Sequence, residues 1–169
     1  MANQLLPWMP EPAAMFAQVA RVLRKGGVFA FATLGPDSLR EIAAAQAAVD
    51  PHAHVNVFAD MHDVGDGLVR AGLADPVLDV DRLTVRYADA GRLFDDLTRT
   101  GARNSLAARG RALAGKARFQ RMTEALAQSG SDEGIVLELE LVYGHCWGTG
   151  VRGDAAEFLI AADEISHRR

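Results

Sequence analysis

Three of the chain's five histidines fall in one stretch, HAHVNVFADMHD (residues 52–63), together with two aspartates. Histidine and aspartate both ligate zinc, and histidine is also the usual general acid or base at neutral pH. The separations within this stretch match no paired ligand spacing of a structural zinc site. No serine of the chain stands in a context that would complete a Ser-His-Asp arrangement. We therefore expect no metal site and assign no catalytic residue here.

The second half of the stretch is better explained as the start of a helix over residues 61–71. Asp60 suits the N-cap position, and Asp63 suits the first turn, where the helix dipole favours a negative charge. Gly72 suits the position that ends this helix. His62 is not part of the apolar stripe, so we expect its side chain to face solvent. The stripe consists of Met61, Val64, Leu68 and Ala71.

The first half of the stretch is a loop that we expect to lie beside a substrate pocket. Residues 28–34, VFAFATL, are apolar without alternation, which is typical of a strand buried on both faces of a parallel sheet. Ligands of such sheets bind outside the carboxyl ends of the strands. Thr33 and Asp37 lie at that end, and the loop with His54 and Asn56 returns from the helix that starts there. These four residues are pocket candidates; alternatively, His54 and Asn56 only hold the loop backbone by hydrogen bonds.

The rest of the chain alternates helical and strand patterns, which indicates an α/β fold with a layered sheet. Only one strand has the fully buried pattern, whereas a doubly wound sheet needs several, so the chain resembles the second half of a domain. The further expected helices cover residues 11–25 (ended by Gly26), 38–49 (capped by Asp37), 90–100 (capped by Asp89) and 116–128, and the further strands cover 82–87 and 135–147.

Bulk composition fits one globular domain in a reducing compartment. The chain has 169 residues, of which 49% are hydrophobic and 24% charged, so an ordinary core can form. The single cysteine, Cys146, excludes an internal disulfide, and we interpret it as a small buried residue rather than a nucleophile. The first residues, MANQLLPWMPE, lack a basic leader followed by an apolar stretch, so we expect no secretory signal, and no apolar run approaches the roughly 20 residues that span a bilayer. We expect a cytoplasmic protein without a membrane or nucleic-acid partner.

Positive charge is concentrated in one window, residues 99–123, which has seven basic residues and no acidic one. Elsewhere, 11 basic residues stand against 22 acidic residues, and the net charge is −4. Such an asymmetry often marks a surface for an anionic partner, although a solvated face is the alternative. The basic residues are Arg99, Arg103, Arg109, Arg111, Lys116, Arg118 and Arg121.

A glycine motif at residues 148–153, GTGVRG, follows the predicted strand 135–147 and matches the G-x-G-x-x-G pattern of dinucleotide loops. That pattern requires a following helix, a second parallel strand and an acidic residue about 20 positions further on. Residues 154–169 are too few for these, so we do not interpret the motif as a cofactor loop.

Six segments, in this order, carry a family resemblance: N-x-x-x-x-W, RVLRKGGVFAFATLGPDSL, H-x-N-x-F, DMHDVGDGLVRAGLADPVLDVDRLTVRY, DDLTRTGARN and ELVYGHCWG. They resemble bacterial malonyl-[acyl-carrier-protein] O-methyltransferases of biotin synthesis, which are class I S-adenosylmethionine (SAM) methyltransferases. The resemblance extends from Asn3 to Gly148 and is most specific in residues 54–104 and 139–148. Lys25 departs from it, since the family usually has proline there.

The resemblance implies the C-terminal half of a Rossmann-like, three-layer methyltransferase sheet that lacks the first four strands, over residues 1–148, with a tail over 149–169. The chain would supply strands five to seven, with the seventh antiparallel between the other two. The glycine-rich SAM loop and the acidic residue that holds the ribose belong to the other half. Asn3 and Trp8 match the segment just after the fourth strand, which implies a cofactor-binding role.

The implied reaction moves a methyl group from SAM to the free carboxylate of malonyl-acyl-carrier protein, and such a displacement needs little acid or base catalysis. Carrier proteins are acidic, so Arg111, Lys116, Arg118 and Arg121 are candidate docking residues. The chain alone is expected to be inactive, and a partner chain or second copy would cover the exposed edge of strand 28–34. The alternatives are a relative of a mitochondrial assembly factor whose homologues hydroxylate arginine, and a fragment without catalytic activity.

Overall fold

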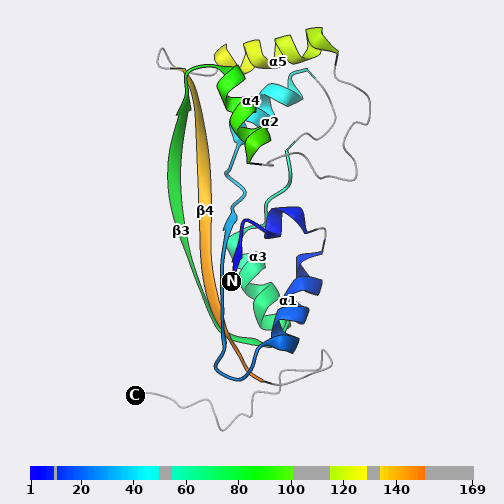
Figure 1. Ribbon diagram of the computed structural model, residues 1–169, viewed down its shortest axis with the longest axis vertical. Helices are drawn as coiled ribbons and strands as arrows, with labels where there is room; N and C mark the ends of the chain where they lie inside the picture. Colours follow the sequence, from blue (N-terminus) through cyan, green and yellow to red (C-terminus); the bar gives the residue numbers. More distant parts are fainter. Residues whose placement is uncertain (10, 50–54, 101–114, 129–133, 151–169) are drawn as a thin grey trace.

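The computed structural model of the chain describes residues 1–9, 11–49, 55–100, 115–128 and 134–150 (Figure 1). In these residues one mixed sheet is packed against helices, which confirms the α/β class. The strands are β1 (Ala2–Asn3), β2 (Val28–Leu34), β3 (Leu73–Tyr87) and β4 (Ile135–Gly148). The helices are η1 (Leu6–Trp8, a 3₁₀-helix), α1 (Pro12–Val22), α2 (Arg40–Ala47), α3 (Met61–Arg70), α4 (Ala90–Arg99) and α5 (Lys116–Gln128).

The sheet has the order β1-β2-β4-β3. β4 lies between β2 and β3 and is antiparallel to both, which is the arrangement that the resemblance implied for the last three strands. β1 is a two-residue strand that pairs in parallel with Phe31 and Ala32 of β2, and the sequence pattern did not predict it.

β3 is much longer than the predicted strand 82–87. It begins at Leu73, and its whole length pairs with β4 except at a bulge between Ala74 and Val77. Asp75 has a positive φ of 48° at this bulge, and Pro76 follows it. Proline occurs within sheets mainly at edges and bulges, so this single irregularity accommodates Pro76 within the strand.

Three helices agree with the predictions. α3 follows Asp60, whose side chain accepts the backbone N–H of His62 at 2.8 Å. α4 follows Asp89, whose side chain accepts the N–H of Arg92 at 2.9 Å. α5 covers the predicted residues 116–128. In α3 and α4, a short polar side chain caps the first turn, as the sequence indicates.

α1 ends earlier than predicted. The helix stops at Val22 because Leu23 adopts an extended conformation with ψ of 127°, so Gly26 is not its stop. Gly26 does take a left-handed φ of 72°, but in the turn that leads into β2, where its N–H donates to the carbonyl of Gly148 at 2.8 Å. Gly148 thus closes the end of β4 against this turn; residues 151–153 of the glycine motif lie outside the described part.

The hydrophobic core consists of two clusters that lie on opposite faces of β4. Side chains alternate along a strand, so Leu137 of one cluster and Cys146 of the other, buried at 2% and 0% exposure, point to opposite faces. Figure 1 shows the corresponding helix groups, α1 with α3 and α2 with α4 and α5, at different heights along the long β3–β4 ribbon. The first cluster contains Leu6, Phe16, Phe29, Phe31, Val64, Leu68, Leu73 and Cys146. The second contains Ile42, Ala45, Leu93, Met122, Leu126, Ile135 and Leu137.

β2 is not buried on both faces in the described structure. Phe29, Phe31 and Thr33 are 5%, 4% and 2% exposed, whereas Val28, on the other face, is 55% exposed. The interpretation of 28–34 as a doubly covered strand is therefore wrong for the described residues, because α1 and α3 pack against one face of β2. The other face is also apolar, and of its residues Val28 is exposed while Ala30, Ala32 and Leu34 are half-buried.

We predict that Gly144→Ala lowers the free energy of unfolding by about 1–3 kcal/mol, because overpacking a filled core strains it. A Cβ atom at this position would lie 2.2 Å from Cζ of Phe31, which stacks on Phe29 with a centroid distance of 5.4 Å. Urea unfolding measures the effect. Gly65→Ala is the control, since its Cβ would meet only the end of the Leu78 side chain at 3.3 Å and would improve helix propensity. A Gly144→Ala midpoint equal to that of the unmodified chain would contradict the packing described.

We also predict that the Cys146 thiol does not react in the folded chain. Its side chain is fully buried, and this burial raises its pKa to about 11. At pH 8 only about 0.1% of such a thiol is thiolate, which is the reactive form. Labelling with a disulfide reagent at pH 8 should therefore require unfolding in urea. Stoichiometric labelling within seconds in native buffer would contradict this.

Candidate functional site

A pocket of about 170 Å³ lies at the carboxyl end of β2. Three segments that are distant in the sequence form it: η1 with the residues after it, the end of β2, and the loop before α3. Thr33 contributes a hydroxyl from a residue that is 2% exposed, and the other lining residues are apolar. The lining residues are Leu6, Pro7, Met9, Pro12, Thr33, Leu34, Val57, Phe58 and Ala59.

The four predicted pocket residues have different positions relative to this pocket. Thr33 lines it. Asn56 precedes the lining residues of the loop, and its Nδ2 donates to the carbonyl of Pro7 at 3.2 Å, which joins two walls. Asp37 lies three residues beyond the wall and makes the contacts described below. His54 lies outside the described residues.

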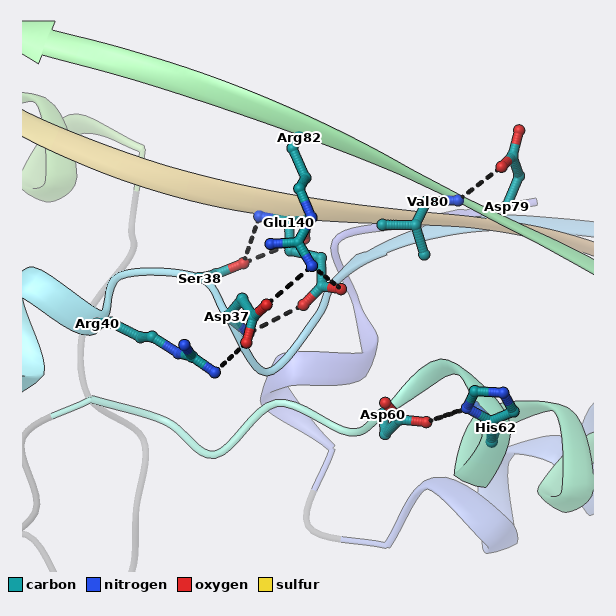
Figure 2. Close-up of polar contacts among 9 residues, drawn as sticks. All are labelled: Asp37, Ser38, Arg40, Asp60, His62, Asp79, Val80, Arg82 and Glu140. Atoms are coloured by element: carbon teal, nitrogen blue, oxygen red, sulfur yellow. Dashed lines mark hydrogen bonds and ion pairs between the residues drawn. The ribbon is translucent and has the colours of Figure 1, made fainter.

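The turn between β2 and α2 is bound to β4 through Ser38 and Glu140 (Figure 2). The Ser38 hydroxyl donates to the carbonyl of Glu140 at 3.1 Å and accepts its backbone N–H at 2.9 Å. The backbone N–H of Gly35 also donates to the Glu140 carbonyl, at 2.8 Å, and that of Leu39 donates to the Glu138 carbonyl, at 3.0 Å. Since Ser38 is 3% exposed, these hydrogen bonds form away from bulk water.

Asp37 belongs to an ionic cluster and does not cap α2, so that prediction is wrong. α2 begins only at Arg40, and the residue before it, Leu39, has a left-handed φ of 60° and no side-chain cap. The Asp37 carboxylate forms ion pairs with Arg40 and, at 2.9 Å, with Arg82 of β3. The N–H of Asp37 donates to Oε2 of Glu140 at 2.9 Å. These long-range partners hold Asp37 outside the cap position.

Sequence reasoning missed Glu140 and Arg82. Glu140 lies on a strand with alternating glutamates, which predicts a solvated face, yet its side chain is only 11% exposed. Arg82 lies directly opposite it in the antiparallel register and approaches it within 3.6 Å. The sequence offers one weak signal, the glycine at position 35: a Cβ there would lie 2.6 Å from the Glu140 carboxylate.

The described residues do not form a complete SAM site. Asn3 lies exposed in β1, and Trp8, 39% exposed, lies in η1 next to the pocket-lining Pro7. The pocket of about 170 Å³ is smaller than the roughly 300 Å³ at which sites for ligands of cofactor size begin. We therefore assign no step of a reaction to SAM bound at these residues alone.

The predicted docking residues divide into two positions on α5. Arg118 and Arg121 are three positions apart, so they are neighbours on one side of the helix. Lys116 is about 160° from Arg118 around the helix axis, at about 100° per residue. Arg111 lies outside the described residues. Phe119 is 45% exposed on α5 and contacts Phe94 of α4 at a centroid distance of 5.3 Å.

The histidine of the capped helix start has a local role. Nδ1 of His62 lies 2.7 Å from Oδ1 of Asp60, and its side chain is 80% exposed. The backbone N–H of His62 and then its imidazole hold the pKa of Asp60 below its ordinary value. Among the described residues, no group of three or more His, Cys, Asp or Glu side chains could hold a metal ion. No helix in the same part of the chain is long and apolar enough to cross a membrane.

The chain is similar to curated malonyl-[acyl-carrier protein] O-methyltransferases. It is 45% identical to that of Laribacter hongkongensis over 147 residues, which cover 87% of this chain and 50% of the relative. It is 42% identical to that of Gallionella capsiferriformans (86% and 50% covered) and 36% identical to enzyme 1 of Coxiella burnetii (99% and 60% covered). The chain thus spans about half the length of the first two relatives. No family model matches it.

Solved structures support the fold. The YcgJ protein of Bacillus subtilis and a putative methyltransferase of Bacillus halodurans, BH2331, each superpose with a TM-score of 0.53 at 12% sequence identity. Each match covers 86% of this chain, and 61% and 66% of the respective neighbour. In sequence, therefore, the chain is similar to about half of the malonyl-[acyl-carrier protein] O-methyltransferases that it matches, and in fold it is similar to part of these two solved structures.

Proposed function

We propose that this chain provides the acceptor side of a SAM-dependent O-methyltransferase that methylates the free carboxylate of malonyl-acyl-carrier protein in biotin synthesis. One observation carries the proposal. The segments that resemble the family, namely N-x-x-x-x-W, FATL and the N-x-F end of H-x-N-x-F, converge from distant parts of the chain on one pocket. The names of the relatives supply the reaction.

The chemistry of the pocket suits a role in orienting the acceptor. Its lining has one polar side chain, the hydroxyl of Thr33, and no titratable group. A carboxylate is already a nucleophile at neutral pH, so it needs no general base. Holding the acceptor in line supplies most of the acceleration available, which reaches roughly 7–11 kcal/mol in favourable cases. In this proposal Asn56 keeps two pocket walls together, and Asn3 and Trp8 lie on the cofactor side.

The acidic carrier protein would dock on α5, in a cytoplasmic enzyme. Arg118 and Arg121 form the continuous part of the basic surface, with Arg111 and Lys116 as further contributors. Complementary charge mainly raises the association rate and selects the partner. Phe119, which is 45% exposed, lies three positions after Lys116 and so adds an apolar contact on the Lys116 side of α5.

The edge of β2 supports the proposal that a second polypeptide, either a partner chain or another copy, completes the sheet. β1 pairs with only Phe31 and Ala32 of this edge, so in the described residues the backbone of 28–30 lacks a neighbour there. Such open edges pair readily with other strands.

Methyl transfer tests the proposal directly. We expect no ester from the chain alone, and methyl ester on malonyl-carrier protein, seen as a 14 Da mass increase, once the half of the Laribacter relative that this chain does not match is co-expressed with it. Either half alone is the control, and SAM titration should show binding only to the combined halves. Turnover by the chain alone, or no ester from a stable complex of both halves, would contradict the proposal.

Charge reversal tests the docking surface. We expect Arg118→Glu with Arg121→Glu to weaken binding of the carrier protein about tenfold at low salt, because like charges then repel. Lys116→Glu, on the other side of α5, should have a smaller effect. Arg70→Glu is the matched control, since Arg70 is a 72% exposed residue of α3. The differences should shrink at high salt, and unchanged binding by the double variant would disprove docking at this surface.

A further inference from the structure

We propose that Glu140 and Arg82 are positioning residues: they set the wall of the acceptor pocket by holding the turn after β2, without touching the ligand. The inference rests on the proposed function for its catalytic consequence, but the geometry stands independently. Neither residue lines the pocket, and both reach the turn at Asp37, four residues after Thr33.

The Glu140 carboxylate has two partners. Its Oε2 accepts the backbone N–H of Asp37 at 2.9 Å, and its Oε1 lies 3.6 Å from Nη2 of Arg82. The same Nη2 lies 2.9 Å from Oδ2 of Asp37. Arg82 therefore joins both carboxylates, so the backbone and the side chain of Asp37 are fixed from β4 and β3 together (Figure 2).

These contacts add to bonds that already attach the turn to the sheet. The backbone N–H groups of Gly35 and Leu39 reach the carbonyls of Glu140 and Glu138, and Ser38 binds the Glu140 backbone on both sides. None of these bonds needs the Glu140 side chain. Removal of its charge should therefore leave the turn attached but free its middle, at Asp37, to change orientation.

Gly35 shows that the turn is built around this carboxylate. The residue directly follows the pocket-lining Leu34, and a Cβ there would lie 2.6 Å from the carboxylate of Glu140. The carboxylate thus occupies the space that a side chain at position 35 would need, directly beside the backbone that leaves the pocket wall. A shift of one therefore moves the other.

Glu138 offers a matched control two residues along the same face of β4. Its carboxylate accepts the hydroxyl of Thr84 at 2.9 Å, a cross-strand contact to β3 rather than to the turn. Glu138→Gln and Glu140→Gln remove the same charge from the same strand. If loss of negative charge from the sheet has a general effect, both variants will show it. An effect on the turn that comes from positioning should appear only in Glu140→Gln.

The first experiment measures amide hydrogen exchange by NMR in the full chain. Glu140→Gln should speed exchange of the Asp37 amide severalfold, since a hydrogen bond to a charged acceptor is about twice as strong as one to a neutral acceptor. The amide signals of Thr33 and Leu34 should also shift. Arg82→Gln, at a 63% exposed side chain, should act in the same direction while the fold is retained. Glu138→Gln should change neither the exchange rate of the Asp37 amide nor the signals of Thr33 and Leu34. The proposal is overturned if the Asp37 amide exchanges equally fast in Glu140→Gln and in the unmodified chain.

The second experiment measures kinetics in the combined halves described above. We expect Glu140→Gln and Arg82→Gln to raise the KM for malonyl-carrier protein about threefold to tenfold, with the KM for SAM and the denaturation midpoint near those of the unmodified enzyme. Glu138→Gln should match the unmodified enzyme. If these variants change the exchange of the Asp37 amide but leave the KM for malonyl-carrier protein unchanged, Glu140 and Arg82 are not positioning residues for the acceptor. If the unmodified halves transfer no methyl group, the proposed function fails, and the exchange data alone decide whether the residues hold the wall.

Discussion

The polypeptide leaves β2 at Leu34 and has to pass alongside β4 before α2 begins. Ser38 and the backbone of Glu140 hold it there by two reciprocal hydrogen bonds of 3.1 and 2.9 Å. At this point the core changes from one face of β4 to the other: Val142 is buried on one side of the crossing and Leu137 on the other. A buried polar crossing is stable only when its donors and acceptors are paired, and no buried side-chain nitrogen or oxygen in the described residues lacks a partner.

The pocket depends on the same crossing. Its β2 wall, Thr33 and Leu34, directly precedes Gly35, where the backbone first bonds to Glu140. The opposite wall is joined to η1 by Asn56 and Pro7. The β2 wall is thus fixed by polar contacts outside the pocket and the loop wall by the hydrogen bond from Asn56 to the lining residue Pro7, while the lining side chains are apolar except for one hydroxyl. Rigid support by residues that do not touch the ligand is what a site based on orientation requires.

The two halves of the described molecule differ in what they contribute. The cluster around Phe16 and Phe31 packs α1 and α3 against the sheet and lies beside the pocket. The cluster around Leu93 and Leu126 joins α2, α4 and α5 at the other end of the ribbon, and it carries the basic residues of α5. A carrier protein docked on α5 would lie on this second cluster, which the turn at Ser38 connects to the pocket wall.

Local sequence determined the features that depend on neighbouring residues. Asp60 and Asp89 cap their helices as predicted, the apolar spacing defines α5, and alternation defines β4, because each signal acts within a few residues. The motifs also indicated the relatives to which the chain is similar, and Thr33, a predicted pocket residue, does line a pocket. Tertiary structure decided the rest. Pro76 lies within a long strand because β4 supplies a partner on both sides of the bulge. Asp37 lies outside the cap position, where Arg82 and Glu140, 45 and 103 residues away, contact it. Such contacts depend on which strands become neighbours, and no local pattern encodes that proximity.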